Sequence, residues 1–130
     1  MIVDSSALVA IIHGVPGYEL LQRQMVFAAK PPRMSSVNFL ETAIVIDGKR
    51  DPKASRKLDD LIKELEIELI DFTPEHARLA RAAYRDFGKG SGHPAKLNFG
   101  DCMAYALAQS EREPLLYVGD DFTHTDLEAA

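Results

Sequence analysis

The chain opens with Met1-Ile2-Val3-Asp4-Ser5-Ser6-Ala7-Leu8, in which a short apolar run is followed at once by polar residues. Asp and Ser cap the amino end of a helix by accepting hydrogen bonds from its first free amides. The stretch therefore predicts a buried strand over residues 1–3 that passes through Asp4 directly into a helix reaching Ile12. A strand followed by a helix is the first half of an α/β unit with a parallel sheet.

The same alternation continues along the chain. Further strands are predicted near residues 33–36, 67–72 and 115–118. Helical spacing of apolar residues, together with cap-then-Pro signals at Asp51-Pro52 and Thr73-Pro74, predicts the intervening helices near residues 18–28, 38–46, 52–65, 74–87 and 100–110. The expected fold is a three-layer α/β/α domain with a four- or five-stranded parallel sheet, occupying residues 1–130 as one domain.

Composition excludes several classes of protein. The chain has 130 residues, 46% of them hydrophobic, and contains no apolar run near the ~18 residues that a membrane span requires. An acid at position 4 does not suit a signal peptide, and the single cysteine, Cys102, cannot form an internal disulfide. We therefore expect a cytoplasmic protein with no membrane association. The formal net charge of −5 argues against a nonspecific DNA-binding protein.

Acidic residues stand where the predicted strands end or the following helices begin. Asp4 follows the first strand, Glu41 is expected in the first turn after the second, Asp101 opens an alanine-rich helix, and Asp120-Asp121 follows the fourth strand. The carboxyl ends of parallel strands meet at one edge of a sheet, so these acids should converge there. Carboxylate oxygens without His or Cys are the ligands that Mg²⁺ or Mn²⁺ prefers.

A structural explanation competes with the metal site for each acid taken alone. Asn38-x-x-Glu41 and Asn98-x-x-Asp101 both have the form of a capping box, and an acid in a first turn stabilises a helix through its dipole. The occurrence of all these acids at strand ends and helix starts favours the metal-site interpretation over capping alone. The four histidines lack zinc-ligand spacing, and His76 is expected on the surface of a helix's first turn.

Four blocks of sequence, in order and at the expected spacing, carry a resemblance to a known family. They are Met1 to Leu8, Ser35-Ser36-Val37-Asn38-Phe39-Leu40-Glu41, Leu97-Asn98-Phe99-Gly100-Asp101-Cys102 with Ala104-Tyr105-Ala106, and Gly119-Asp120-Asp121-Phe122 with Thr125-Asp126. Together they closely resemble the PIN-domain nucleases, and specifically the VapC-type toxins of type II toxin–antitoxin systems. The resemblance covers essentially the whole chain.

The resemblance implies a metal-dependent endoribonuclease that cleaves RNA with Mg²⁺ or Mn²⁺, is held inactive by a VapB-type antitoxin and works as a homodimer. It implies Asp4, Glu41, Asp101 and one of Asp120 or Asp121 as catalytic metal ligands. We assign Asp121, because Phe122 would anchor it by packing on the core, and leave Asp120 as a supporting or solvent-facing group. Further supporting residues near the ligands would be Ser6, Thr123 and Asp126.

Other interpretations remain open at this stage. The chain can be a PIN-like nuclease that is not a toxin, or a related module that binds or regulates without activity. A phosphorylated receiver domain is disfavoured, since no Lys follows the late strand. The glycine-rich loop with Lys89, His93 and Lys96 either steers RNA or is simply a solvated loop.

Overall fold

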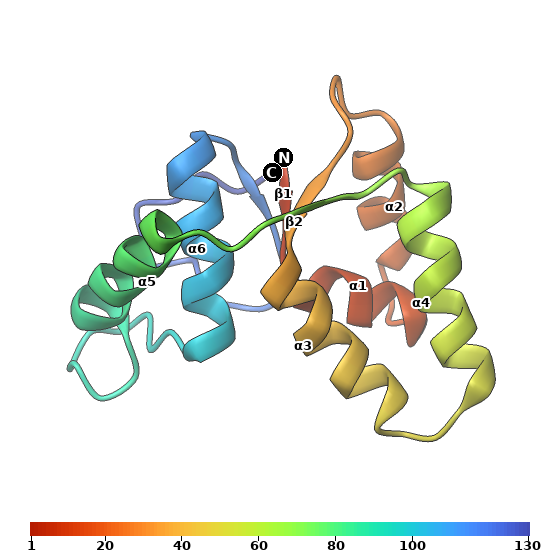
Figure 1. Ribbon diagram of the computed structural model, residues 1–130, viewed down its shortest axis with the longest axis horizontal. Helices are drawn as coiled ribbons and strands as arrows, with labels where there is room; N and C mark the ends of the chain where they lie inside the picture. Colours follow the sequence, from red (N-terminus) through yellow and green to blue (C-terminus); the bar gives the residue numbers. More distant parts are fainter.

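The computed structural model describes residues 1–130 and contains four strands and six helices (Figure 1). In chain order they are β1 (Ile2–Val3), α1 (Ser5–Ile12), α2 (Tyr18–Val26), β2 (Arg33–Ser35), α3 (Ser36–Asp47), α4 (Pro52–Glu64), β3 (Glu68–Ile70), α5 (Pro74–Phe87), α6 (Phe99–Glu111) and β4 (Leu115–Leu116). No helix has the length and apolar character needed to cross a membrane.

All four strands are parallel and lie in the order β3-β2-β1-β4. Ile2 of β1 pairs with Arg33 on one side and with Leu115 on the other, so β1 lies inside the sheet. Parallel neighbours require crossover connections, which the helices supply. The predicted α/β fold with a parallel sheet is confirmed, and the sheet has four strands where we expected four or five.

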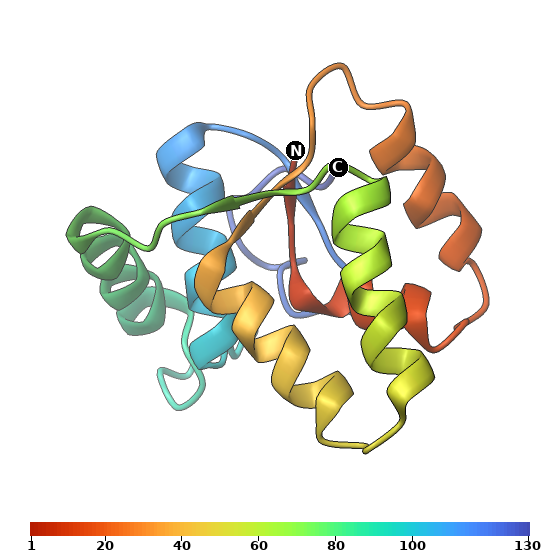
Figure 2. The same cartoon turned by 45° about the vertical axis from the view of Figure 1, so that its right-hand side comes forward.

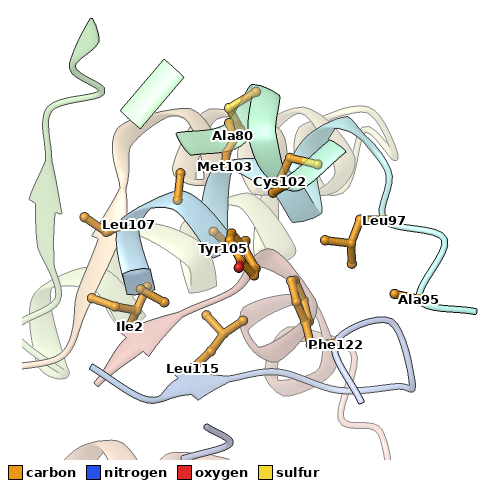
Figure 3. Packing of buried hydrophobic residues seen from close by; sticks show 14 residues of the cluster. Ile2, Ala80, Ala95, Leu97, Cys102, Met103, Tyr105, Leu107, Leu115 and Phe122 are labelled. Atoms are coloured by element: carbon orange, nitrogen blue, oxygen red, sulfur yellow. The ribbon is translucent and has the colours of Figure 1, made fainter. Parts of the chain in front are cut away.

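Helices cover both faces of the sheet, α5 and α6 on one side and α1 to α4 on the other, as the two views in Figures 1 and 2 show. Successive side chains of a strand point to opposite faces. Ile2 and Leu115 accordingly belong to the apolar cluster under α5 and α6 (Figure 3), whereas Val3 and Leu116 belong to the cluster under α1 to α4. Because both residues of these short strands are buried, the strands read as unbroken apolar runs in the sequence.

The predicted helix starts at Asp51 and Thr73 are confirmed by their hydrogen bonds. Asp51 Oδ1 accepts from the Lys53 amide at 3.0 Å, and Thr73 Oγ1 accepts from the His76 amide at 3.1 Å. The prediction of His76 as a surface residue is wrong. Its side chain is buried because Nδ1 accepts from the Thr73 amide and the ring packs against Phe72.

Helix α3, which follows β2, starts earlier than expected. Helix α3 begins at Ser36, two residues before the predicted start, because Ser35 is its N-cap and accepts from the Val37 amide at 3.3 Å. The end of the chain, which the sequence left unassigned, returns to the sheet. The Leu115 amide donates to Glu128 O and the Ala130 amide donates to Leu115 O, both at 2.9 Å, so the tail lies beside β4.

Candidate metal centre

Asp4 connects β1 to α1 and is the N-cap of that helix. Its carboxylate accepts from the Ser6 amide at 3.0 Å and from the Ser6 hydroxyl, and the residue is only 4% exposed. Burial raises the pKa of the Asp4 carboxyl above its usual value, and the nearby charge of Glu41 raises it further, against the lowering effect of the Ser6 hydrogen bonds. Asp4 is thus both a helix cap and a carboxylate whose charged form is less favoured than in water.

Ser6, which we expected near the ligands, links two segments of the chain. Its hydroxyl donates to Asp4 Oδ2 and accepts from the Val118 amide at 3.0 Å, which ties the start of α1 to the segment after β4. The position of Asp4 therefore depends on chain that is distant in sequence.

Glu41 lies in the second turn of α3, and its predicted place in the first turn is wrong because the helix starts earlier. The Ser5 hydroxyl donates to Glu41 Oε1, and Asn38 Nδ2 donates to the same oxygen at 3.3 Å. A Cβ atom placed on Gly100 would lie 1.8 Å from Glu41 Oε2. The absence of a side chain at position 100 therefore leaves the space that the carboxylate occupies.

Asn38 is the residue whose role the sequence misassigned. It is not an N-cap, since Ser35 fills that position, and its side chain is fully buried. Asn38 Nδ2 donates to Gly100 O at 3.0 Å as well as to Glu41, so one amide joins α3 to the start of α6. These two acceptors fix the orientation of the amide and leave Asn38 Oδ1 without a hydrogen-bond partner.

Asp101 lies in the first turn of α6, where the predicted capping box is confirmed. Asn98 Oδ1 accepts from the Asp101 amide at 2.9 Å, and Asp101 Oδ2 accepts from the Asn98 amide at 3.0 Å. Burial raises the pKa of the Asp101 carboxyl to about 7; the charges of Asp121 and Asp4 add to this, while the Asn98 amide opposes it. The capping and metal-site interpretations are therefore compatible for this residue.

The segment after β4 supplies the remaining acids. Asp121 lies close enough to Asp101 to raise the pKa of that carboxyl, and the neighbouring Phe122 is buried against Tyr117. Asp120 and Thr123 are both exposed. Asp126 points elsewhere, because its carboxylate accepts from the Tyr105 hydroxyl at 2.7 Å and from Gln109.

The four acids form a chain of like charges at the carboxyl edge of the sheet. Asp4 interacts electrostatically with Glu41 and with Asp101, and Asp101 interacts with Asp121. None of the four is paired with a Lys, Arg or His side chain. No three His, Cys, Asp or Glu side chains are gathered tightly enough to hold an ion as they stand. The donor set nevertheless fits a hard divalent cation, which would relieve the repulsion and the burial cost together.

Cys102, which follows Asp101, has no part in this donor set. Burial, with the adjacent Asp101 charge, raises the pKa of its thiol to about 11, so the thiol stays protonated at neutral pH. It belongs, with Ala80, Met103 and Leu97, to the apolar cluster of Figure 3.

Fold and acids together define an α/β domain that gathers carboxylates at the carboxyl edge of a parallel sheet. The family model described as "PIN domain" matches residues 1–128. The chain belongs to the PIN-domain family.

Relatives that match the whole chain place it, within this family, among the VapC ribonucleases. The chain is 51% identical over 130 residues to ribonuclease VapC28 of Mycobacterium tuberculosis, covering 100% of this chain and 97% of the relative. It is 45% identical over 130 residues to ribonuclease VapC42 of the same species, covering 100% of this chain and 98% of the relative.

Two solved structures share the fold at low sequence identity. The crystal structure of Mycobacterium tuberculosis VapC20, described as a sarcin–ricin loop cleaving toxin, superposes with a TM-score of 0.76 at 14% identity, covering 99% of this chain and 97% of that one. A toxin–antitoxin complex from Klebsiella pneumoniae gives a TM-score of 0.69 at 15% identity, covering 96% of this chain and 92% of that chain.

Proposed function

We propose that this protein is a metal-dependent endoribonuclease and the toxin of a toxin–antitoxin pair, and that it cleaves RNA in the cytoplasm with Mg²⁺ or Mn²⁺. The observation that carries the metal dependence is the chain of four acids, two of them buried, without a cationic partner. The toxin role is supported by the VapC relatives that match the chain over its full length.

Asp4, Glu41, Asp101 and Asp121 would hold the ion. A divalent cation held there would supply Lewis acidity, which would polarise a phosphate oxygen and lower the pKa of water. The chain's own contribution is orientation: Ser6 restrains Asp4, Ser5 and Asn38 restrain Glu41, and the Asn98 amide restrains Asp101. Preorganised ligands of this kind reduce the rearrangement that the reaction requires.

The test is cleavage of RNA by the purified protein in Mg²⁺, in Mn²⁺ and in EDTA. We expect cleavage with either metal and none after chelation. Because the neighbour VapC20 is described as cleaving the sarcin–ricin loop, an RNA containing that loop is one substrate to include beside total RNA. Undiminished cleavage after exhaustive chelation would refute the metal-dependent mechanism.

The proposed partner is a VapB-type antitoxin, supported by the structural match to a toxin–antitoxin complex. Expression of the protein alone should arrest growth, and co-expression of a small protein encoded beside it should restore growth. Failure of every small co-encoded protein to bind the toxin would count against this pairing.

We also propose a homodimer in which α3 packs against a second copy. Three aliphatic side chains of α3 support this: Leu40 is 57% exposed, Ile44 64% and Val45 42%. Their spacing places them near one another on the helix surface, where they border the hollow that contains Glu41. Ile44→Asp should shift sedimentation toward the monomer, whereas an unchanged oligomeric state would argue against this surface.

A further inference from the structure

A second feature of the site is a mainly apolar groove of about 700 Å³ between α5 and α6. Ala80, Cys102 and Met103 form apolar parts of its wall. Two aromatic rings line it while remaining open to solvent, Tyr84 at 51% exposure and Phe99 at 73%. A groove of this size can accommodate a group as large as a nucleobase.

The groove is bordered by cationic side chains although the protein is acidic. Arg81 from α5 and Lys89 from the following loop both line it. Residues 74–97 contain five Lys and Arg residues against two acids, whereas the rest of the chain contains ten against eighteen. This part of the surface therefore suits a negatively charged ligand.

The loop that carries Lys89 is fixed at its base. The Lys89 amide donates to Leu97 O and the Leu97 amide donates to Phe87 O, both at 2.9 Å. The Tyr84 hydroxyl also donates to Lys89 O at 3.1 Å, which joins the aromatic wall to the loop. Lys89 thus extends from a backbone position that hydrogen bonds define.

Phe99 connects this groove to the acids. It is the first residue of α6, two positions before Asp101, and it lines both the α5–α6 groove and the neighbouring hollow that contains Glu41 and Gly100. An RNA strand whose phosphate lies at the acids would therefore bring an adjacent nucleotide to Phe99.

We propose that the α5–α6 groove binds a nucleotide next to the cleaved bond of single-stranded RNA, with Phe99 stacking on the base and Arg81 and Lys89 contacting the phosphates. The inference rests on the proposed ribonuclease function. Exposed aromatic rings beside cations form the combination that binds single strands, because every base has a face that can stack. In a duplex the bases are already stacked, so the groove selects unpaired RNA. The hollow beside the aliphatic face of α3 is lined by no Lys or Arg side chain, so that face suits protein contact instead.

The test measures binding in EDTA, where the proposed metal-dependent cleavage cannot interfere. The probes are a short fluorescein-labelled single-stranded RNA of mixed sequence and its duplex form, followed by fluorescence anisotropy. We expect Phe99→Ala to weaken single-strand binding about tenfold, to leave duplex binding unchanged, and to be rescued by Phe99→Tyr. Arg81→Ala and Lys89→Ala should weaken binding to both probes and reduce its salt dependence. Phe27→Ala is the matched control, since Phe27 is 82% exposed at the end of α2 and should have no effect.

Two further measurements separate the alternatives. Equal losses of affinity for single-stranded and duplex RNA on Phe99→Ala would overturn the proposal. A change in sedimentation on Tyr84→Ala, whose ring lines the α5–α6 groove and not the hollow beside α3, would identify the groove as a protein interface and would also overturn it. Cleavage of the same single strand by the unaltered protein in Mg²⁺ tests the proposed function separately. If the protein cleaves RNA but its affinity for the single strand does not depend on Phe99, only the groove proposal is refuted. Inactive protein that still binds single strands through Phe99 supports the groove and refutes the catalytic proposal.

Discussion

Replacing Gly100 with Ala should strongly reduce RNA cleavage without unfolding the protein. The added Cβ would lie 1.8 Å from Glu41 Oε2, whereas Cβ atoms essentially never come within 3.0 Å of a non-bonded heavy atom, so the carboxylate must move by more than 1 Å. A displacement of about 1 Å in a catalytic group can cost about a hundredfold in rate. We therefore expect kcat for RNA cleavage in Mg²⁺ to fall about a hundredfold.

The stability of the Gly100→Ala protein should change little, because two effects oppose each other. Alanine stabilises a helix relative to glycine by about 0.5–1 kcal/mol. Displacing Glu41 breaks its hydrogen bonds to Ser5 and Asn38, at a net cost of about 1 kcal/mol each before the freed carboxylate is hydrated. The free energy of unfolding, measured by denaturant titration in EDTA, should stay within about 2 kcal/mol of the unaltered protein.

A compensating variant tests the cause. In the Glu41→Asp background the shorter side chain avoids the new methyl group. Adding Gly100→Ala to Glu41→Asp should therefore lower kcat much less than adding it to the unaltered protein. Full activity of Gly100→Ala alone would refute the steric argument, as would equal penalties in the two backgrounds.

The remaining predictions concern the other carboxylates. Asp4→Asn and Asp101→Asn should each abolish cleavage yet raise the melting temperature in EDTA, because each removes the cost of burying a carboxylate and the repulsion from neighbouring acids; a lower melting temperature for both would indicate that capping is their main role. Asp121→Asn should reduce cleavage severely and Asp120→Asn only slightly, compared at limiting and saturating Mg²⁺, and the opposite ranking would transfer the metal ligand to Asp120. In EDTA the unaltered protein should lose stability as the pH rises from about 4 to about 7, since the raised pKa of Asp101 means that the folded state binds more protons in that window. The melting temperature of Asp101→Asn should change less with pH across this range than that of the unaltered protein. An equal change in both proteins would contradict the raised pKa of Asp101.

The features that were predictable from the sequence are those with a local cause. Asp4, Asp51, Thr73 and Asn98 cap helices through hydrogen bonds to amides two or three residues away, and such bonds leave a recognisable pattern. The parallel sheet followed from the alternation of apolar runs with helices. Asp4 and Asp101 lie at the same edge of the sheet because the carboxyl ends of parallel strands meet there.

The features that escaped prediction depend on contacts between distant segments. Asn38 and Asn98 stand in the same local pattern, an apolar residue, Asn, Phe, any residue and an acid, yet one crosses to Gly100 and the other caps its own helix. The difference arises because Ser35 starts α3 early and turns Asn38 toward α6, 62 residues away in sequence. Gly100 did leave a signal, since a glycine inside a helix costs stability and indicates a close approach by another group.

The burial of Cys102 has a practical consequence for solution studies. With its pKa raised to about 11 and its side chain almost fully buried, the only native thiol should react slowly with maleimide at neutral pH. A cysteine introduced at an exposed position, such as Ser91 in the loop before α6, would then be the one site that takes a fluorophore. Labelled in this way, the protein would report movements of that loop by fluorescence with little background from the native sulfur.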